Sequence, residues 1–343
     1  MFDNLPTRLH IELTTACNAA CPACARYLDD DPILGIVENP NVPQNSLTLE
    51  KVKEILEIEW IKKLKSIKIS GVHGEPTLAK ECIDIIKWFR EINPDVSLEL
   101  DSNGSTRTKK WWRELAQFFQ SDHIGNNLMT FWIDGLEDTN HIYRRRTVWS
   151  KIMENAQAFI DAGGLARWQM IVWEHNEHQI LTARKMAKSM GFNRFGVRIS
   201  ERHLSRPITW LKTPKYYKKP LIDTTVHCQA QIMDELFVSA NGLLTPCCFI
   251  DELIYGPHMQ SSQQETLETM GDLLQYHGSN GMSNVIKLFN RVSDRFQTNP
   301  LEVCKTMCTK TYGNHHMDQD KIVEIFPNES ASKGKLVPKF SDY

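Results

Sequence analysis

The chain has 343 residues, 41% of them hydrophobic, and its 40 Lys and Arg residues against 42 Asp and Glu residues give a net charge of −2. This balance gives no electrostatic footprint for nucleic acid, and no apolar run approaches the roughly 20 residues of a membrane span. The N-terminus has no signal-peptide core. We therefore predict a cytoplasmic protein with no nucleic-acid and no membrane partner. In that compartment its nine cysteines are expected to be metal ligands rather than disulfides.

A strand followed by a helix recurs six times in the first 200 residues. Such alternation predicts parallel strands joined by right-handed crossovers, and six units are fewer than the eight of a closed TIM barrel. The predicted strands are residues 9–13, 66–70, 96–100, 128–133, 168–173 and 195–199.

Two stretches between the first strands carry further predictions. Residues 28–45 include Pro32, Pro40 and Pro43 and are predicted to form a long irregular connection, of the kind that serves as a lid or binding loop. Cys82 begins an apolar series at helical spacing, so we predict a core residue there and not a metal ligand.

The loop after the first strand holds Cys17, Cys21 and Cys24, spaced C-x3-C-x2-C. Three thiolates within eight residues can converge on one metal centre, but a structural zinc site closes with four protein ligands. Three thiolates suit a [4Fe–4S] cluster in which one iron is left for a non-protein ligand. The alternatives are a redox-inert zinc knuckle or a chance clustering of cysteines.

This spacing, directly after a first strand, resembles the radical S-adenosylmethionine (SAM) enzymes. The resemblance implies an α/β fold with an incomplete (β/α)6, TIM-like barrel, open on one side. It implies that Cys17, Cys21 and Cys24 are catalytic: they would hold a [4Fe–4S] cluster whose open iron binds SAM. An electron from that cluster would cleave SAM to a 5′-deoxyadenosyl radical.

Two later loops resemble SAM-binding motifs of the same family. Gly74, Glu75 and Pro76 resemble its GGEP motif, whose backbone and carboxylate hold the SAM ammonium, although His73 stands in place of the first glycine. Ser102-Asn103 resembles its ribose contact. The structural alternatives are a Pro-containing turn with a solvated Glu and an Asn-Gly turn that caps the next helix.

Weaker matches follow the fourth, fifth and sixth strands. Asp134 resembles the end of an S-x-D-G motif, but Trp132 stands where that motif has Ser. Asn176 and Arg198 match positions that reach the SAM carboxylate or ribose in the family. Ala23 occupies the place of an aromatic residue beside the adenine. Trp132 puts a hydroxyl contact to SAM in doubt, and Ala23 bears on SAM affinity more than on membership of the family.

A new composition begins after a basic linker at residues 212–225. A predicted hairpin, with strands at residues 236–238 and 243–246, lies between Cys228 and Cys247. The pattern resembles the start of SPASM and twitch domains, and the limited number of later cysteines makes twitch the nearer match. The metal ligands implied for one auxiliary [4Fe–4S] cluster are Cys228, Cys247, Cys304 and Cys308.

Two alternatives remain for this C-terminal part. Four cysteines also permit a zinc site, and Cys248 could replace Cys247 as a ligand. We divide the chain into a barrel at residues 1–211, the linker at 212–225, an auxiliary-cluster domain at 226–312 and a polar, partly disordered tail at 313–343. Residues 260–297 are predicted to be helical and polar and to cover the open side of the barrel.

The resemblance implies a radical SAM oxidoreductase. The substrate would be a peptide or protein side chain or a small molecule, and the electron donor a flavodoxin or ferredoxin. The auxiliary cluster would assist oxidation or electron transfer. The competing interpretation is a non-catalytic iron–sulfur or zinc module for binding or electron transfer, under which Glu75, Asn103 and Asp134 would have no purpose. A glycyl-radical activase is a third interpretation, but the ferredoxin-like cysteine runs typical of activases are absent.

Overall fold

The structure is a computed structural model of the chain. It describes residues 5–31, 35–120, 126–200, 208–215, 221–222, 225–255, 268, 283–296, 298–312, 315–316 and 322–325.

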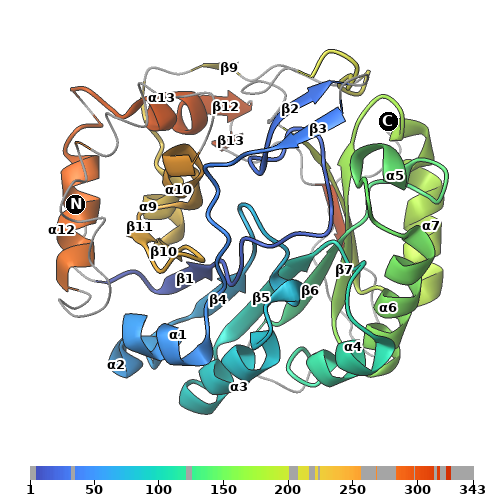
Figure 1. The fold of residues 1–343 in the computed structure, drawn as a ribbon, viewed down its shortest axis with the longest axis horizontal. Coiled ribbons are helices and arrows are strands. Elements are labelled where there is room, and N and C mark those ends of the chain that lie inside the picture. The colour runs from blue at the N-terminus through green and yellow to red at the C-terminus, as the bar shows by residue number, and fades with distance from the viewer. Residues whose placement is uncertain are drawn as a thin grey trace.

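Six parallel strands form the centre of the molecule and pair in chain order, as the sequence predicts. The sheet curves, and its helices lie along the outer side of the curve (Figure 1). The prediction of an open, TIM-like partial barrel with a mostly parallel sheet is confirmed. The strands are β1 (Arg8–Ile11), β4 (Ser66–Ile69), β5 (Ser97–Ser102), β6 (Leu128–Trp132), β7 (Ala166–Val172) and β8 (Arg194–Ile199).

The helices between these strands begin and end where local chemistry predicts. Thr48 caps α1 by accepting a hydrogen bond from the Lys51 amide at 3.1 Å, and Gly191 ends α7 in the left-handed conformation at φ 88°. These elements are α1 (Leu49–Ile55), α2 (Ile58–Ile61), α3 (Cys82–Ile92), α4 (Lys109–Ala116), α5 (Asn140–Tyr143), α6 (Trp149–Asp161) and α7 (Ile180–Met190), with 3-10 turns η1 (Pro76–Leu78) and η2 (Glu177–Gln179).

Alternate residues of each strand face opposite sides of the curved sheet. Leu9 and Ile11 of β1 join the apolar core under the helices, which also includes Cys82, as predicted. His10, between Leu9 and Ile11, belongs to the inner face. That face is polar: Lys68 of β4 lies 3.5 Å from Asp101 of β5. The barrel interior is therefore built for charged groups, whereas the apolar core lies outside it.

The stretch after the cysteine loop corrects one prediction. Residues 28–45 do not form an irregular connection throughout, because β2 (Tyr27–Asp31) and β3 (Gly35–Glu38) pair as antiparallel strands. The β-branched residues of β3 favour a strand. Their run is short and follows a proline, so the sequence alone did not predict a strand there.

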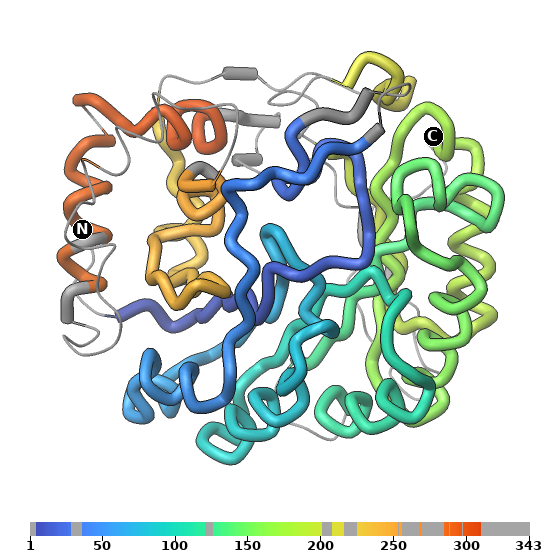
Figure 2. The backbone as a smooth tube through the Cα atoms, in the orientation of Figure 1, coloured from blue at the N-terminus to red at the C-terminus, as the bar shows by residue number. Residues whose placement is uncertain are grey.

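The predicted C-terminal hairpin is present as β10 (Glu235–Val238) and β11 (Leu244–Thr245). Its position was not predicted: β10 pairs in parallel with β1 and extends the barrel sheet. Figure 2 shows this orange segment beside the blue first strand. At the other edge of the sheet, β14 (Ile322–Ile325), from the stretch expected to be a polar tail, pairs antiparallel with β8.

The remaining elements belong to the C-terminal part of the chain, and α9, α10 and α12 contact this hairpin. α12 falls within the range predicted to be helical, and most of residues 260–282 lie outside the described residues. The strands β13, β12 and β9 form a small antiparallel sheet. These elements are α9 (Gln229–Met233), α10 (Cys248–Tyr255), α12 (Ser283–Ser293), α13 (Glu302–Cys308), β9 (Leu221–Ile222), β12 (Lys310–Tyr312) and β13 (His315–His316). Among the described residues, no helix combines the length and apolarity that a membrane crossing needs.

Candidate active site

The three-cysteine loop lies at the carboxyl end of β1. The Cys24 amide donates to the Cys21 carbonyl at 3.2 Å, and Ala23 between them has a φ of 59°, so the chain turns sharply within the motif. Burial raises the pKa of the Cys17 thiol, and the neighbouring Glu75, Cys21 and Cys24 raise it further. The structure thus brings the three predicted ligands together beside Glu75.

Backbone and side-chain hydrogen bonds tie this loop to the loops that follow later strands. The Glu75 amide donates to the Ala16 carbonyl at 2.8 Å, and the Asn103 side-chain amide donates to Asn18 Oδ1 at 2.9 Å. Carboxyl ends of parallel strands meet at one edge of the sheet, so residues far apart in the sequence share one site.

Glu75 lies at the centre of these contacts and is buried. Its Oε1 accepts from the Thr77 hydroxyl at 2.7 Å, and its Oε2 accepts from the Asn103 amide at 2.8 Å. Burial raises the pKa of this carboxyl, and the hydrogen bonds from Asn103 and Thr77 oppose that rise. Glu75 therefore joins the loops after β4 and β5.

The residues flanking Glu75 explain the shape of its loop. A Cβ on Gly74 would lie 1.7 Å from the Thr14 carbonyl oxygen, so only glycine lets this loop pack against the cysteine loop. Pro76 is buried and occupies the first turn of η1, where its missing N–H costs nothing.

Ser102 and Asn103 are buried at the end of β5. Ser102 Oγ accepts from the Gly104 amide at 2.9 Å, and Asn103 Oδ1 accepts from the Ser105 amide at 2.9 Å. These bonds form the turn of the structural alternative, but the next helix, α4, is capped by Thr108 and not by Asn103. Other hydrogen bonds hold Asn103 against Glu75 and the cysteine loop.

Asp134 is buried after β6 and forms an ion pair that the sequence analysis missed. Arg144 Nε donates to Asp134 Oδ2 at 2.6 Å, and Arg144 Nη1 lies 3.8 Å from Cys21 Sγ. Burial raises the pKa of Cys21 to about 11, although the Arg144 charge opposes the rise. In the sequence, Arg144 is one of three consecutive arginines, and only the fold places it beside a cysteine.

The last two predicted contact residues lie differently. Asn176 is fully buried, and its side-chain amide donates to the backbone carbonyls of Asp134 and Ile171 at 2.9 Å each. Arg198 is exposed on β8, opposite Ile171 of β7. Asn176 therefore joins the loop after β7 to the loop after β6 by hydrogen bonds, whereas the Arg198 side chain is exposed to solvent.

The four predicted auxiliary ligands also come together. Burial raises the pKa of Cys247 well above its usual value, and the neighbouring thiols of Cys308, Cys228 and Cys304 add to this, as does Cys248. Cys228 precedes α9, Cys247 precedes α10, and Cys304 and Cys308 lie one turn apart on α13.

Cys248 is turned towards the barrel. Burial would lower the pKa of His10, but hydrogen bonds with Cys248 and Glu235 raise it to about 9. Of the two adjacent cysteines, Cys247 therefore faces the other three ligands and Cys248 also contacts a barrel residue.

The chemistry of the two donor sets can be compared with the needs of a metal centre. A structural zinc site closes with four protein ligands, so three cysteines alone do not complete one. A [4Fe–4S] cluster binds each thiolate through a different iron, so three thiolates leave one iron without a protein ligand and four thiolates complete the set. Both donor sets fit clusters of this type, and the C-terminal four also match a zinc site in number.

These features define an open parallel α/β barrel with a three-cysteine loop at the carboxyl ends of its strands. The sequence profile described as "Radical SAM superfamily" matches residues 11–194. The chain belongs to this superfamily.

Curated relatives and solved structures are also similar to the chain. A "Probable GTP 3′,8-cyclase" of Pyrococcus horikoshii is 32% identical over 105 residues, which are 31% of this chain and 29% of that protein. The "GTP 3′,8-cyclase" of Campylobacter lari is 23% identical over 273 residues, which cover 72% of this chain and 81% of that protein.

Two solved structures share the fold. Streptococcus suis SuiB bound to S-adenosylmethionine has a TM-score of 0.52 at 15% identity, covering 88% of this chain and 77% of that one. Another SuiB structure is matched over 61% of its own length. A histidine-tagged form of anSMEcpe with bound AdoMet has a TM-score of 0.51 at 14% identity, covering 85% of this chain and 83% of that one.

Proposed function

We propose that the protein is a cytoplasmic radical SAM oxidoreductase that abstracts a hydrogen atom from a peptide or protein side chain or from a small molecule. The observation that carries this proposal is the convergence of Cys17, Cys21 and Cys24 beside Glu75 at the carboxyl ends of the barrel strands. Superfamily membership supports it.

Cys17, Cys21 and Cys24 would hold a [4Fe–4S] cluster with one iron open to SAM. When bound, the cluster and SAM supply the chemistry: one electron cleaves SAM to methionine and a 5′-deoxyadenosyl radical, which takes a hydrogen atom from the substrate. The protein contributes binding, orientation and exclusion of water.

Each neighbouring group has a distinct task in this proposal. The buried Glu75 carboxylate attracts the ammonium of SAM while Thr77 and Asn103 fix its position. Gly74 brings the backbone of the same loop close to the cysteine loop. Arg198, exposed at the end of β8, is free to approach the SAM carboxylate.

Cys228, Cys247, Cys304 and Cys308 would hold an auxiliary [4Fe–4S] cluster that assists oxidation or electron transfer in a twitch-like segment. Their convergence around Cys247 supports this assignment. With four protein ligands, this site leaves no position for SAM. A flavodoxin or ferredoxin is the expected electron donor.

The relatives suggest which small molecules to test. Two carry the name GTP 3′,8-cyclase, so a purine nucleotide is one candidate substrate for this chain. The polar inner face of the barrel, with Lys68 and Asp101, suits a charged substrate. Peptides from neighbouring genes form the second candidate class.

Hydrogen transfer tests the proposal. Anaerobically reconstituted protein receives a reductant, SAM and either GTP or a candidate peptide, each fully deuterated at carbon. Mass spectrometry should find deuterium in 5′-deoxyadenosine with one substrate and not with the other. A protein with a full iron load that forms no 5′-deoxyadenosine under any condition would instead support the non-catalytic module.

A further inference from the structure

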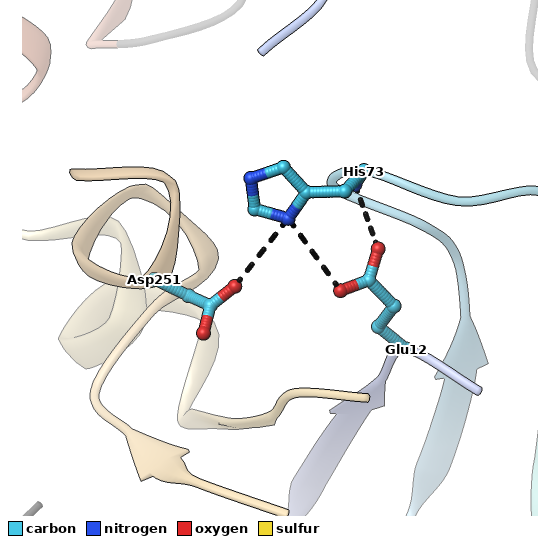
Figure 3. Close-up of side chains that lie close together, drawn as sticks. All are labelled: Glu12, His73 and Asp251. Carbon is cyan, nitrogen blue, oxygen red and sulfur yellow. Dashed lines mark hydrogen bonds and ion pairs between the residues drawn. The ribbon is translucent and has the colours of Figure 1, made fainter. Parts of the chain in front are cut away.

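Three buried ionisable side chains meet between the barrel and the C-terminal segment, outside the proposed SAM contacts (Figure 3). Glu12 follows β1, His73 lies in the loop after β4, and Asp251 lies on α10. Their exposed fractions are 1%, 2% and 0%.

The distances between them are too long for hydrogen bonds. His73 Nδ1 lies 3.8 Å from Glu12 Oε2 and 3.7 Å from Asp251 Oδ2, whereas an N–H···O bond spans about 2.7–3.2 Å. Glu12 Oε2 and both carboxylate oxygens of Asp251 make no hydrogen bond of ordinary length and angle, although the Ser239 hydroxyl lies close enough to Asp251 to oppose the rise in its pKa. Figure 3 shows both carboxylates directed at the same edge of the imidazole. Buried oxygens without partners are costly, so something is expected to lie between these groups.

The second oxygen of Glu12 is, by contrast, well satisfied. Glu12 Oε1 accepts hydrogen bonds from the amides of Val72, His73 and Gly74 at 2.7, 2.7 and 3.0 Å. These bonds fix the carboxylate, so Oε2 is held facing the imidazole and Asp251. The cluster is therefore preorganised by the same loop that carries Glu75.

The cluster also lacks positive charge. Among the described residues, His73 is the only basic side chain within 4.0 Å of either carboxylate. Even a protonated His73 would leave one buried negative charge uncompensated. Burial raises the pKa of Asp251 to about 7, and the charge of Glu12 adds to this, while His73 and the nearby Ser239 hydroxyl oppose it.

We propose that Glu12, His73 and Asp251 bind one divalent first-row transition-metal ion. Their ligand atoms lie within 4.8 Å of one another. Ligands at about 2.1 Å from an ion lie roughly 3.4 Å apart. The distances of 3.8 and 3.7 Å from His73 to the two carboxylates therefore need to shorten only slightly, and the two carboxylates can be at most 4.8 Å apart before they close on the ion. One imidazole and two carboxylates suit ions such as manganese, iron or zinc, and a charge of +2 balances both carboxylates.

This ion has a structural consequence that does not depend on the radical chemistry. It would join the loop before Glu75 to α10, whose first residue follows Cys247. The two cysteine groups would then be held in a fixed relation by a metal bridge between them.

Manganese is the probe, because Mn²⁺ prefers carboxylates over the thiolates of the cysteine sites. Cluster-loaded protein is titrated with Mn²⁺, and the loss of the free-ion EPR signal measures binding. We expect one Mn²⁺ per chain in the wild type, at least tenfold weaker binding in Asp251→Asn and Glu12→Gln, and a rise in Tm with Mn²⁺ in the wild type only. Asp101→Asn, which alters a partly buried carboxylate paired with Lys68 outside the cluster, is the matched control and should bind as the wild type does.

A wild-type measurement keeps the test valid if a variant fails to fold. Pulsed EPR of the bound Mn²⁺ should show coupling to one imidazole nitrogen. No Mn²⁺ uptake by the wild type would overturn the proposal and leave a protonated imidazole between two carboxylates. Equal uptake by all four proteins, or bound Mn²⁺ without a nitrogen coupling, would place the ion elsewhere and also overturn it.

Discussion

The two groups of cysteines are assembled in different ways. Cys17, Cys21 and Cys24 come from one loop, and a single sharp turn at Ala23 brings them together. The C-terminal group draws ligands from the starts of α9 and α10 and from α13. In the proposed assignment, the short loop supplies three thiolates and would leave one iron open, whereas the separate elements supply four and would complete the second site.

Their surroundings also differ. The guanidinium of Arg144 lies 3.8 Å from Cys21 Sγ, whereas Cys247 is surrounded by other thiols that raise its pKa further. The three-cysteine group therefore lies beside a positive charge and at the carboxyl ends of the strands, where a substrate can bind. Under the proposed function, the first site would activate SAM and the second would exchange electrons.

Replacing Cys17, Cys21 and Cys24 with Ala should have the largest effect. SAM cleavage should be abolished, because no site with an open iron remains, and the iron content should fall from about eight to about four per chain. Iron analysis and mass spectrometry of 5′-deoxyadenosine check both. If the variant still made 5′-deoxyadenosine, the cleavage site would be elsewhere.

The converse variant is Cys304→Ala/Cys308→Ala. Iron should again fall to about four per chain, but SAM cleavage without substrate should persist while substrate turnover collapses. Cys82→Ala, which alters a buried core cysteine, is the control and should keep about eight irons. One zinc and four irons in the wild type would contradict the auxiliary cluster.

Glu75→Gln should weaken SAM binding roughly ten- to a hundredfold, because a charge-assisted hydrogen bond is worth about 1.5–3 kcal/mol. The amide also places an N–H₂ group against donors from Thr77 or Asn103, so a lower Tm is expected. Equilibrium measurement of SAM binding to the folded variant separates the loss of SAM affinity from the loss of stability. Unchanged SAM affinity in folded protein would place the carboxylate outside the pocket.

Arg144→Met should have the smallest functional effect. Loss of a positive charge beside Cys21 should make the first cluster harder to reduce, so its reduction potential should fall. A fall of about 59 mV corresponds to a tenfold smaller equilibrium constant for this one-electron reduction. Combining it with Asp134→Asn avoids an unpaired buried carboxylate, which would otherwise cost about 3–5 kcal/mol. Spectroelectrochemical titration measures the potential.

Arg144→Lys and Arg145→Met are the controls for that titration. Lysine keeps the charge, and Arg145 packs over the Trp210 ring at 4.8 Å, so both should leave the potential close to that of the wild type. Asp134→Asn alone is the reference for the double variant, because the Asp134 charge opposes that of Arg144 at Cys21. A potential that is the same in Arg144→Met/Asp134→Asn as in Asp134→Asn would show that the guanidinium does not influence the cluster.

Local patterns predicted the strands of the barrel well, because alternation and helical spacing report burial directly. The spacing of Cys17, Cys21 and Cys24 is visible in the sequence, whereas Cys228, Cys247, Cys304 and Cys308 were grouped through the resemblance to twitch domains. Pairing between distant segments has no such local sign. For this reason the parallel contact of β10 with β1 and the antiparallel contact of β14 with β8 were not predicted.

The candidate site divides in the same way. Glu75 and Asn103 were found by motif, but their mutual hydrogen bond required the fold. Arg144 and the Glu12, His73 and Asp251 cluster carry no recognisable spacing, because their members come from loops and helices that meet only after folding. Their chemistry is visible only when burial and distance are known.

The central claim is that one iron at the three-cysteine site is open to SAM, and labelled SAM tests it most directly. Reduced wild-type protein is mixed with SAM carrying ¹⁵N in its amino group and examined by pulsed EPR. The account predicts one ¹⁵N coupling, which is kept in Cys304→Ala/Cys308→Ala and lost when Cys17, Cys21 and Cys24 are replaced. A coupling that survives loss of those three cysteines, or none in fully loaded wild type, would contradict it.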